Sequence, residues 1–159
     1  MRQKIYVETS IPSFYFDTRT SAEMLAMKRW TRRFWDEERW SFDLVTAAPV
    51  LAELRAAPSP KRELALTLVN DLPVLEASKE VRDVVAFYLA KKLMPSRDSE
   101  DAAHLAFATV HGCDWLLTWN CAHLANARKF GHIQAVNDLL GLRSPGLITP
   151  MQLLTDEKD

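Results

Sequence analysis

The sequence predicts an α/β protein with a parallel sheet, and three observations support this class. Short β-branched or aromatic segments alternate along the chain with longer stretches of helix-forming residues, as they do in parallel α/β proteins. The 159 residues have the length of one domain, so we expect a single domain over residues 1–159. Hydrophobic residues make up 48% of the chain and charged residues 26%, a balance typical of folded globular proteins that excludes a disordered chain.

The first 40 residues predict one strand and two helices. Residues 4–7 (KIYV) are β-branched and aromatic, so they are expected to form a strand. Ser10 followed by Pro12 predicts a helix that begins directly after it, with Ser10 as its N-cap. Residues 20–40 lack Gly and Pro and carry Met and aromatic residues at three- to four-residue spacing, which predicts one amphipathic helix.

The middle of the chain continues the alternation. Residues 42–46 (FDLVT) predict a second strand, and residues 47–57 a helix with a proline in its first turn. Two further prolines separate that helix from another over about residues 61–71. Residues 73–76 (PVLE) predict a third short strand, which a helix over residues 78–93 follows.

The last third contains the most apolar strand candidate, residues 115–118 (WLLT), as expected for a strand buried on both faces. Asp98 or Ser99 is expected to cap the helix before it, which runs to His111 and ends at Gly112. The rest of the chain predicts helices over residues 122–129 and 132–141, a strand over residues 147–149 and a helical turn that begins at Pro150.

The charges of the chain nearly cancel. Lys and Arg number 20 and Asp and Glu 21, which gives a net charge of −1 and no global positive field for nucleic acid. Basic surface is nevertheless expected locally, because basic residues cluster at Lys28, Arg29, Arg32 and Arg33, at Arg55, Lys61 and Arg62, and at Lys91, Lys92 and Arg97.

The sequence also indicates where the protein acts. Its polar start runs directly into the first strand, and no apolar run approaches the ~20 residues of a membrane span. Cys113 and Cys121 are too few for a disulfide framework. We therefore expect a cytoplasmic protein with no membrane partner.

Acidic and amide side chains fall at one edge of the predicted sheet. The carboxyl ends of parallel strands meet at a single edge, where ligands bind in open α/β sheets. Carboxylates gathered there repel one another without a cation, and Mg²⁺ or Mn²⁺ suits oxygen ligands. The residues concerned are Glu8 after the first strand, Glu53 in the helix after the second, Asp98, Glu100 and Asp101 at the start of the helix before the fourth, and Asn120 after the fourth.

Each of these residues also has a purely structural interpretation. Glu8 can interact with the dipole of the helix that follows, and Glu53 can face solvent or pair with a base. Asp98 and Asp101 can form a capping pair, which is the favoured interpretation for Asp98. Asn120 can serve only as a turn residue.

Four segments in this order resemble the PIN domain family, and most of all the VapC-type toxins of prokaryotic toxin–antitoxin pairs. The segments are ETSIP at residues 8–12, VLAEL at 50–54, EDAAHLAFA at 100–108 and LLTWN at 116–120. The resemblance covers nearly the whole chain, including the closing ITPMQLL at residues 148–154. It implies a PIN-like domain with a parallel five-stranded sheet flanked by helices, and an endoribonuclease with an acidic Mg²⁺ or Mn²⁺ site. It also implies an RNA substrate, a VapB-like antitoxin partner and a homodimer.

The resemblance also implies a role for individual residues. The first three acids, which hold the metal, fall on Glu8, Glu53 and Asp101, and the fourth catalytic position, often Asp, falls on Asn120. The hydroxyl that contacts the substrate phosphate falls on Ser10 or Thr9. Residues placed behind these ligands are Asp98, Glu100 and His104.

Two departures from the family pattern motivate an alternative function. Glu8 is one methylene longer than the usual Asp, and Asn120 removes a negative charge and so weakens attraction for a divalent ion. The alternative is a catalytically degenerate PIN-fold protein that binds RNA or a partner. A metal-dependent phosphatase on another α/β fold is a third hypothesis, but an Asp-x-Asp motif after the first strand is missing.

Other residues have competing interpretations. His104 is expected to be a hydrogen-bonded core histidine rather than a metal ligand. Cys113, Cys121, His123 and His132 have no standard zinc spacing. Trp30, Trp35 and Trp40, close to several arginines, predict either core packing beside a basic face, an interface for an antitoxin or second subunit, or a platform for RNA bases.

Overall fold

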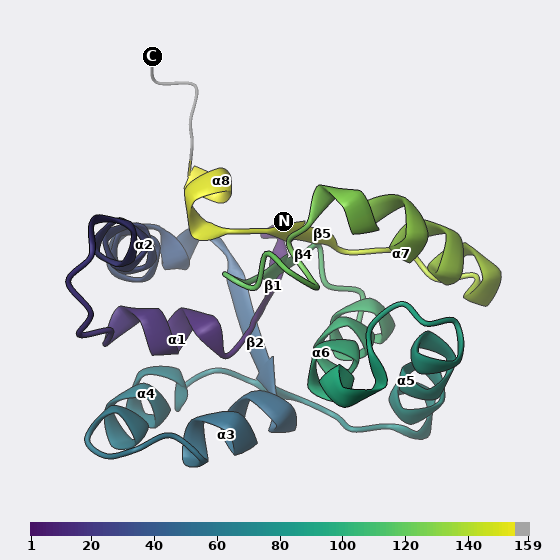
Figure 1. The fold of residues 1–159 in the computed structure, drawn as a ribbon, viewed down its shortest axis with the longest axis horizontal. Coiled ribbons are helices and arrows are strands. Elements are labelled where there is room, and N and C mark those ends of the chain that lie inside the picture. Colours follow the sequence, from purple (N-terminus) through teal and green to yellow (C-terminus); the bar gives the residue numbers. More distant parts are fainter. Residues whose placement is uncertain (155–159) are drawn as a thin grey trace.

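Five parallel strands form one sheet in the computed structural model, which describes residues 1–154 (Figure 1). The order β3-β2-β1-β4-β5 places β1 at the centre, where Tyr6 pairs with Val45 on one side and Leu116 on the other. The α/β class and the five-stranded parallel sheet are therefore confirmed. The strands are β1 Lys4–Val7, β2 Asp43–Ala47, β3 Val74–Leu75, β4 Trp115–Leu117 and β5 Gly146–Ile148.

Helices cover both faces of this sheet. Figure 1 shows α1 and α2 on one side and α5 and α6 on the other. Local chemistry sets several helix ends: Ser21, Ser78 and Asn126 accept backbone N–H bonds at the starts of α2, α5 and α7, and Gly141 ends α7 in the left-handed conformation. The helices are α1 Ser10–Tyr15, α2 Ala22–Arg33, α3 Ala48–Arg55, α4 Lys61–Val69, α5 Lys79–Ala90, α6 Ser99–Val110, α7 Ala127–Leu140 and α8 Pro150–Leu154.

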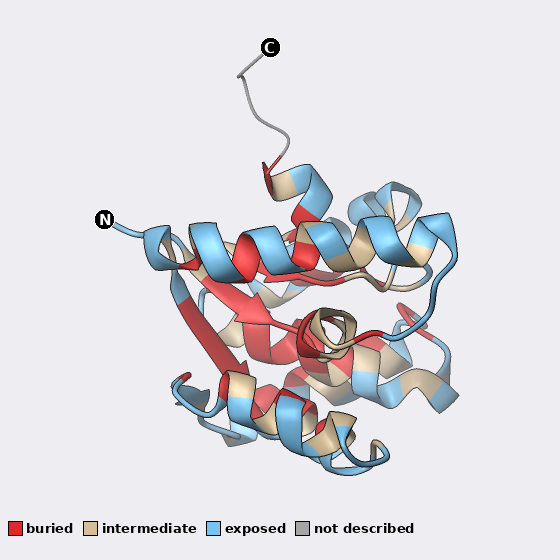
Figure 2. Cartoon of the chain, turned by 90° about the vertical axis from the view of Figure 1, so that its left-hand side faces the viewer, coloured by how far each residue is buried: buried red, intermediate tan, exposed pale blue. Residues whose placement is uncertain are grey.

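The core lies between the sheet and these helices. Ile5, Tyr6 and Val7 are fully buried, and Figure 2 shows the strands as buried segments beneath helices with exposed outer faces. Helix α6 is the most deeply buried of the helices, since its side chains from Leu105 to Thr109 are all buried. Any polar side chain on its inner face is consequently held in a fixed place.

The single helix expected over residues 20–40 is wrong in its second half. Helix α2 ends at Arg33, a wider π-helical turn follows over Phe34–Glu38, and a 3₁₀ turn ends the segment at Ser41. Phe34 and Trp35 are neighbours and both are buried. The wider turn directs both rings into the core, which one regular amphipathic face does not do.

The tryptophans of this segment divide between core and surface. Trp35 is buried, as the core-packing interpretation predicts, whereas Trp40 is 65% exposed. The guanidinium of Arg39 lies over both rings, 4.5 Å from the centre of Trp35 and 4.6 Å from that of Trp40, and it also pairs with Asp71 at 3.0 Å.

The two helices expected over residues 122–129 and 132–141 are one. Helix α7 continues through Gly131, because Ile133 and Val136 on its inner face are buried against the core. Residues before Asn126 form turns instead of a helix. Strand β3 is also shorter than predicted, with two residues. Within residues 1–154, every helix is too short or too polar to cross a bilayer.

Candidate acidic site at the carboxyl edge of the sheet

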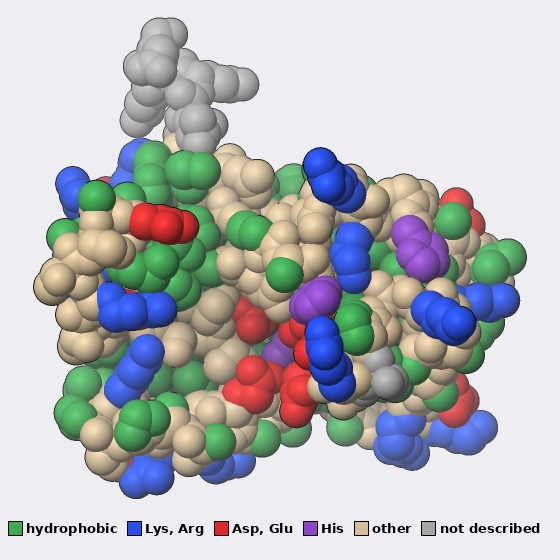
Figure 3. All heavy atoms as spheres, viewed as in Figure 1, with side chains coloured by type: hydrophobic (Ala, Val, Ile, Leu, Met, Phe, Trp, Pro, Cys, Tyr) green, Lys and Arg blue, Asp and Glu red, His purple; other side chains and the backbone are tan. Residues whose placement is uncertain are grey.

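Acidic side chains and histidines gather at the carboxyl edge of the sheet. Figure 3 shows them at the centre of one face, between α3 and α6, with basic side chains around them. Three segments far apart in sequence bring them together: Glu8 directly follows β1, Glu53 lies in α3 after β2, and Asp101 and His104 lie in the first half of α6. The predicted convergence of these elements is thus present in the fold.

Glu8 is held from three directions. Its Oε2 accepts the backbone N–H of Ser10 at 2.9 Å, the hydroxyl of Ser10, and the hydroxyl of Thr118 at 2.7 Å. Glu8 is only 6% exposed, so these donors replace the water that its carboxylate loses. The hydroxyls in turn accept backbone N–H groups after β4, Ser10 from Trp119 and Thr118 from Asn120. Residues after the two central strands are therefore tied together around one carboxylate.

Ser10 is not the N-cap that the sequence predicts, and its hydroxyl bonds to Glu8. It is the first residue of α1, and Thr9 occupies the N-cap position without a side-chain bond, so the predicted Ser10 cap is wrong. Its hydroxyl is instead turned to Glu8, the residue two places before it. The hydroxyl of Thr9 is buried and has no hydrogen-bond partner in the described part of the chain.

Glu53 ends a chain of buried polar groups that begins inside the sheet. The phenol of Tyr6 lies 2.7 Å from Nδ1 of His104, and Nε2 of His104 lies 2.6 Å from Oε1 of Glu53. Burial raises the pKa of Tyr6 well above its usual range. Burial alone would lower the pKa of His104, but the hydrogen bond to Glu53 and the surrounding carboxylates raise it overall. The imidazole is 1% exposed, so its position is fixed by contacts on both sides.

Asp101 has a different set of partners. Its Oδ1 accepts a hydrogen bond from the side-chain amide of Asn120 at 3.1 Å, and burial raises its pKa. The side-chain oxygen of Asn120 accepts the backbone N–H groups of Ala122 at 3.2 Å and His123 at 3.1 Å. Asn120 is thus both the turn residue of the structural interpretation and a partner of a predicted metal ligand. The side-chain oxygen of Asn120 is therefore occupied by hydrogen bonds within the turn.

Asp98 is also not the cap that the sequence predicts. It stands at the N-cap position of α6, but its side chain makes no capping bond. Its carboxylate lies 3.2 Å from Nε2 of His123 and 3.8 Å from Nε of Arg97. The turn that Asn120 stabilises places His123 next to the Asp98 carboxylate. Asp98 therefore pairs with His123 and does not accept a backbone N–H at the start of α6.

The structure sorts these side chains into two groups. One ligand atom from each of Glu8, Glu53 and His104 lies within 4.8 Å of the others, and we call these residues the inner group. Ligand atoms of Asp98, Asp101 and His123 satisfy the same limit, and they form the outer group. Of the remaining predicted residues, Glu100 is exposed and belongs to neither group.

His123 is the residue that sequence reasoning missed in this site. The sequence suggests it only as a member of a zinc set, and neither group contains Cys113, Cys121 or His132 among the described residues. Its place three residues after Asn120, in the turn beyond β4, is the signal that points to it. His104 joins the acids more closely than expected.

The donor set of the inner group fits a divalent cation. Two carboxylates and one imidazole converge, and carboxylate oxygens with imidazole nitrogen are ordinary ligands of such ions. Carboxylates this close to one another repel unless a positive charge lies between them. The residues present are therefore suited to hold an ion, with Asp101 nearby as a further acidic group.

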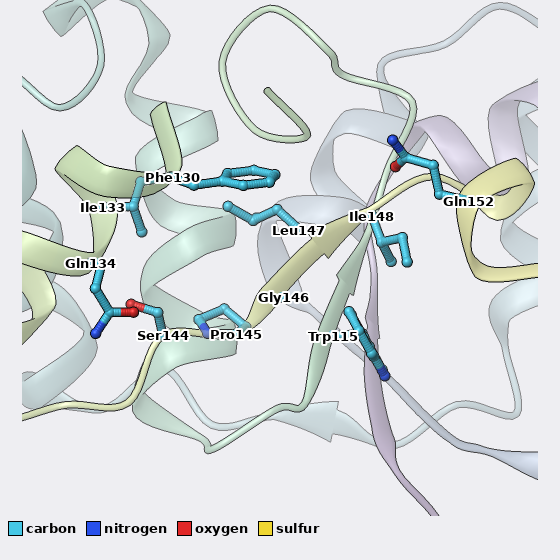
Figure 4. Close-up of a pocket in the computed structure, with 10 residues that line it drawn as sticks. All are labelled: Trp115, Phe130, Ile133, Gln134, Ser144, Pro145, Gly146, Leu147, Ile148 and Gln152. Carbon is cyan, nitrogen blue, oxygen red and sulfur yellow. The ribbon is translucent and has the colours of Figure 1, made fainter. Parts of the chain in front are cut away.

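Two hollows elsewhere on the molecule have other chemistry. A pocket of about 540 Å³ between α7, β4 and β5 has no titratable side chain among its lining residues (Figure 4). Phe130 and Leu147 form part of its apolar wall, and Gln134 and Gln152 are among its polar groups. A second, open hollow of about 560 Å³ on α2 is lined by Arg29, Trp30, Arg33 and neighbouring residues.

Two solved structures have the same fold. The crystal structure of VapBC2 from Rickettsia felis bound to a DNA fragment from their promoter matches with a TM-score of 0.53 and 11% identity, over 92% of this chain and 98% of that chain. The crystal structure of FitAcB from Neisseria gonorrhoeae matches with a TM-score of 0.51 and 14% identity, over 92% of this chain and 97% of that chain. No protein-family model and no curated protein matches the sequence. The chain therefore shares the fold of these two structures, a PIN-like α/β fold with a five-stranded parallel sheet, as the sequence resemblance implies.

Proposed function

We propose that this protein is a metal-dependent endoribonuclease of the VapC type, which hydrolyses RNA phosphodiesters with Mg²⁺ or Mn²⁺ as its cofactor. The observation that carries the proposal is the meeting of Glu8, Glu53 and His104 at the carboxyl edge of a PIN-like sheet, with Asp101 in the adjoining group. Residues from three separate elements converge there, and structural stability alone gives no reason to collect carboxylates in a half-buried place.

Glu8, Glu53 and Asp101 are the residues that would hold the ion. Ser10 and Thr118 fix the carboxylate of Glu8, since both donate to its Oε2. A divalent ion bound there would activate water and neutralise charge that develops on the phosphodiester. Asn120 serves by keeping Asp101 in position through its amide, in place of the direct oxygen ligand that an Asp would provide.

Substrate contacts are proposed on both sides of this centre. Ser10 and the backbone N–H groups at the start of α1 would steady the substrate phosphate, and the unpartnered hydroxyl of Thr9 would join them only if the buried side chain turned outward. Arginine and lysine side chains around the acidic centre would contact flanking phosphates, which adds affinity but little sequence preference (Figure 3).

The proposal includes a protein partner in the cytoplasm. One of the matching structures is a VapBC2 assembly, and by analogy a VapB-like antitoxin would restrain this chain. The hollow on α2 offers arginines beside Trp30, a combination enriched where proteins bind tightly. A homodimer is part of the same proposal and is testable by light scattering of the purified chain.

The first test is cleavage of a mixed pool of structured RNAs by antitoxin-free protein in Mg²⁺, in Mn²⁺ and in EDTA. We expect cleavage that needs a divalent ion and that disappears in Asp101→Ala. Asp83→Ala is the matched control, because Asp83 is exposed on α5 and pairs only with Lys79 in the same helix. Circular dichroism would establish that both variants retain the fold.

One observation favours the alternative of a catalytically degenerate protein that binds RNA or a partner. The side-chain oxygen of Asn120 is committed to the turn, so the fourth position supplies neither charge nor a ligand oxygen. Absence of cleavage by the folded chain with either metal, together with retained RNA binding in a filter assay, would support this alternative and contradict the nuclease.

A further inference from the structure

We propose that His104 is itself a ligand of the divalent ion and that the site therefore prefers a transition-metal ion such as Mn²⁺ to Mg²⁺. This inference rests on the proposed metal-dependent function and specifies the cofactor of the same site. It departs from the expectation that the metal ligands are carboxylates alone, with His104 behind them.

The first support is the direction of the imidazole. Nε2 of His104 faces Glu53 and lies 2.6 Å from its Oε1. A ring nitrogen of His104 lies within 4.8 Å of a carboxylate oxygen of Glu8 and of one of Glu53. Neighbouring ligands of an octahedral ion, each about 2.1 Å from it, lie about 3 Å apart. A small change therefore converts the observed pair into two neighbouring ligands.

The second support is that the imidazole of His104 is held more firmly than the carboxylate of Glu53, which is the more exposed of the two. His104 is 1% exposed, and its Nδ1 lies 2.7 Å from the phenol of the fully buried Tyr6. Metal-binding histidines characteristically have their other ring nitrogen anchored in this way. The Glu53 side chain is 33% exposed and can rotate to admit an ion. The fixed imidazole then presents its nitrogen where the carboxylate now lies.

The third support is that two oxygens at this edge are already engaged. Oε2 of Glu8 accepts three hydrogen bonds, and the side-chain oxygen of Asn120 accepts two. An ion at the inner group competes with those donors for these two oxygens. Nε2 of His104 is instead bonded to Oε1 of Glu53, itself a member of the inner group, so an ion that enters between them replaces that one bond.

The nature of this donor sets the preference among ions. Mg²⁺ binds oxygen and keeps much of its water, whereas first-row transition-metal ions accept imidazole nitrogen readily. A site of two carboxylates and one imidazole should accordingly bind Mn²⁺ or Co²⁺ more tightly than Mg²⁺, and the difference should depend on His104.

The test measures binding of Mn²⁺ and of Mg²⁺ to the purified chain by titration calorimetry, without RNA. We expect His104→Gln to lower the affinity for Mn²⁺ about 100-fold or more and the affinity for Mg²⁺ by about tenfold or less. The matched control is His132→Gln, an exposed histidine on α7, which should change neither. Equal losses for both ions in His104→Gln would mean that His104 only positions Glu53, and would overturn the proposal.

A second measurement has its main readout on the unaltered chain, so it does not require that His104→Gln folds. Pulsed electron paramagnetic resonance of the unaltered chain with one equivalent of Mn²⁺ should show coupling to a directly bound imidazole nitrogen. The coupling should persist in His123→Gln, since His123 belongs to the outer group. Bound Mn²⁺ without nitrogen coupling, or coupling that disappears in His123→Gln, contradicts the role of His104 and leaves the nuclease proposal standing. No binding of either ion contradicts the metal-dependent function itself.

Discussion

The inner and outer groups contain the same kinds of side chain, two carboxylates and one histidine, yet they are built differently. In the inner group Glu8 is 6% and His104 1% exposed, and donors from outside the group fix both. In the outer group the side chains of Asp98 and His123 are 29% and 28% exposed, and they are paired with each other. Buried donors from outside the inner group fix two of its members, whereas the outer group combines a partly exposed ion pair with Asp101, which Asn120 holds.

The difference follows from the elements that carry each group. Glu8 follows a central strand and His104 lies on the buried face of α6, so packing decides where they point. Asp98 lies at the open start of the same helix, and His123 lies in a turn beyond β4. Side chains at the ends of helices and in turns have more conformational freedom than side chains packed in the core. The comparison teaches that catalytic geometry should depend most on the inner group.

Within the inner group, the largest expected effect comes from Glu8→Gln. The amide keeps the shape of the carboxylate but removes its charge, so the ion loses a ligand that three hydrogen bonds hold in place. We expect the rate of RNA cleavage in Mn²⁺ to fall about 10³-fold, a loss of the size seen when a group that stabilises transition-state charge is removed. Initial rates on a defined RNA would measure it, with Glu80→Gln on the exposed face of α5 as the control. A rate within tenfold of the unaltered chain would show that the inner group is not the catalytic centre.

A matched pair of buried threonines tests how far preorganisation contributes. Thr118 donates to Glu8 and accepts the N–H of Asn120, so Thr118→Val should lower Mn²⁺ affinity about 10- to 100-fold. Thr46 is equally buried at the end of β2, but its hydroxyl has no hydrogen-bond partner among residues 1–154. Thr46→Val should leave affinity unchanged and stabilise the fold by about 1 kcal/mol. Equal Mn²⁺ affinities in the two variants, by calorimetry, would mean that Glu8 needs no such support.

The sequence predicts the parts of this arrangement that follow from local pattern and topology. It does not predict the parts that depend on contacts between residues far apart in the chain. Alternation of strand and helix segments placed Glu8, Glu53 and Asp101 at one edge, because parallel topology alone brings strand ends together. The division into two groups was not predictable. It depends on side-chain bonds such as that between Tyr6 and His104, 98 residues apart, which no local pattern records.

Tertiary contacts also explain why two of the predicted helix boundaries are wrong. The π-helical turn after α2 arises because adjacent Phe34 and Trp35 are both buried, and Gly131 stays inside α7 because the helix around it packs on the core. In each case a favourable burial outweighs a weak local preference of a few tenths to about 1 kcal/mol.

A site remote from both groups separates stability from metal binding. A Cβ at Gly146 would overlap the ring of Trp115, which packs over that position and donates from Nε1 to Gln3 at 2.9 Å. Gly146→Ala should therefore lower the free energy of unfolding by about 1–3 kcal/mol with unchanged Mn²⁺ affinity. Gly131→Ala is the matched control: nothing lies within 4 Å of its added methyl, and inside α7 the change should stabilise by about 0.5–1 kcal/mol. Urea denaturation measures both, and a loss of metal affinity in Gly146→Ala would mean that the two regions are coupled.

The smallest expected effect is that of Asp98→Asn, and it decides whether the two groups act apart. The pair between Asp98 and His123 is partly exposed at 3.2 Å, and pairs of this kind contribute about 0–1 kcal/mol. An Asn keeps an oxygen that can accept from the imidazole, so cleavage should fall about fivefold or less, which corresponds to about 1 kcal/mol in the barrier. Rates and Mn²⁺ stoichiometry should be measured together. A loss as large as that of Glu8→Gln, with two ions bound in the unaltered chain and one in the variant, would show that the outer group holds an ion of its own. The distinction drawn between a fixed inner group and an adaptable outer one would then fail, because charge pairing alone would have sufficed to build half of the centre.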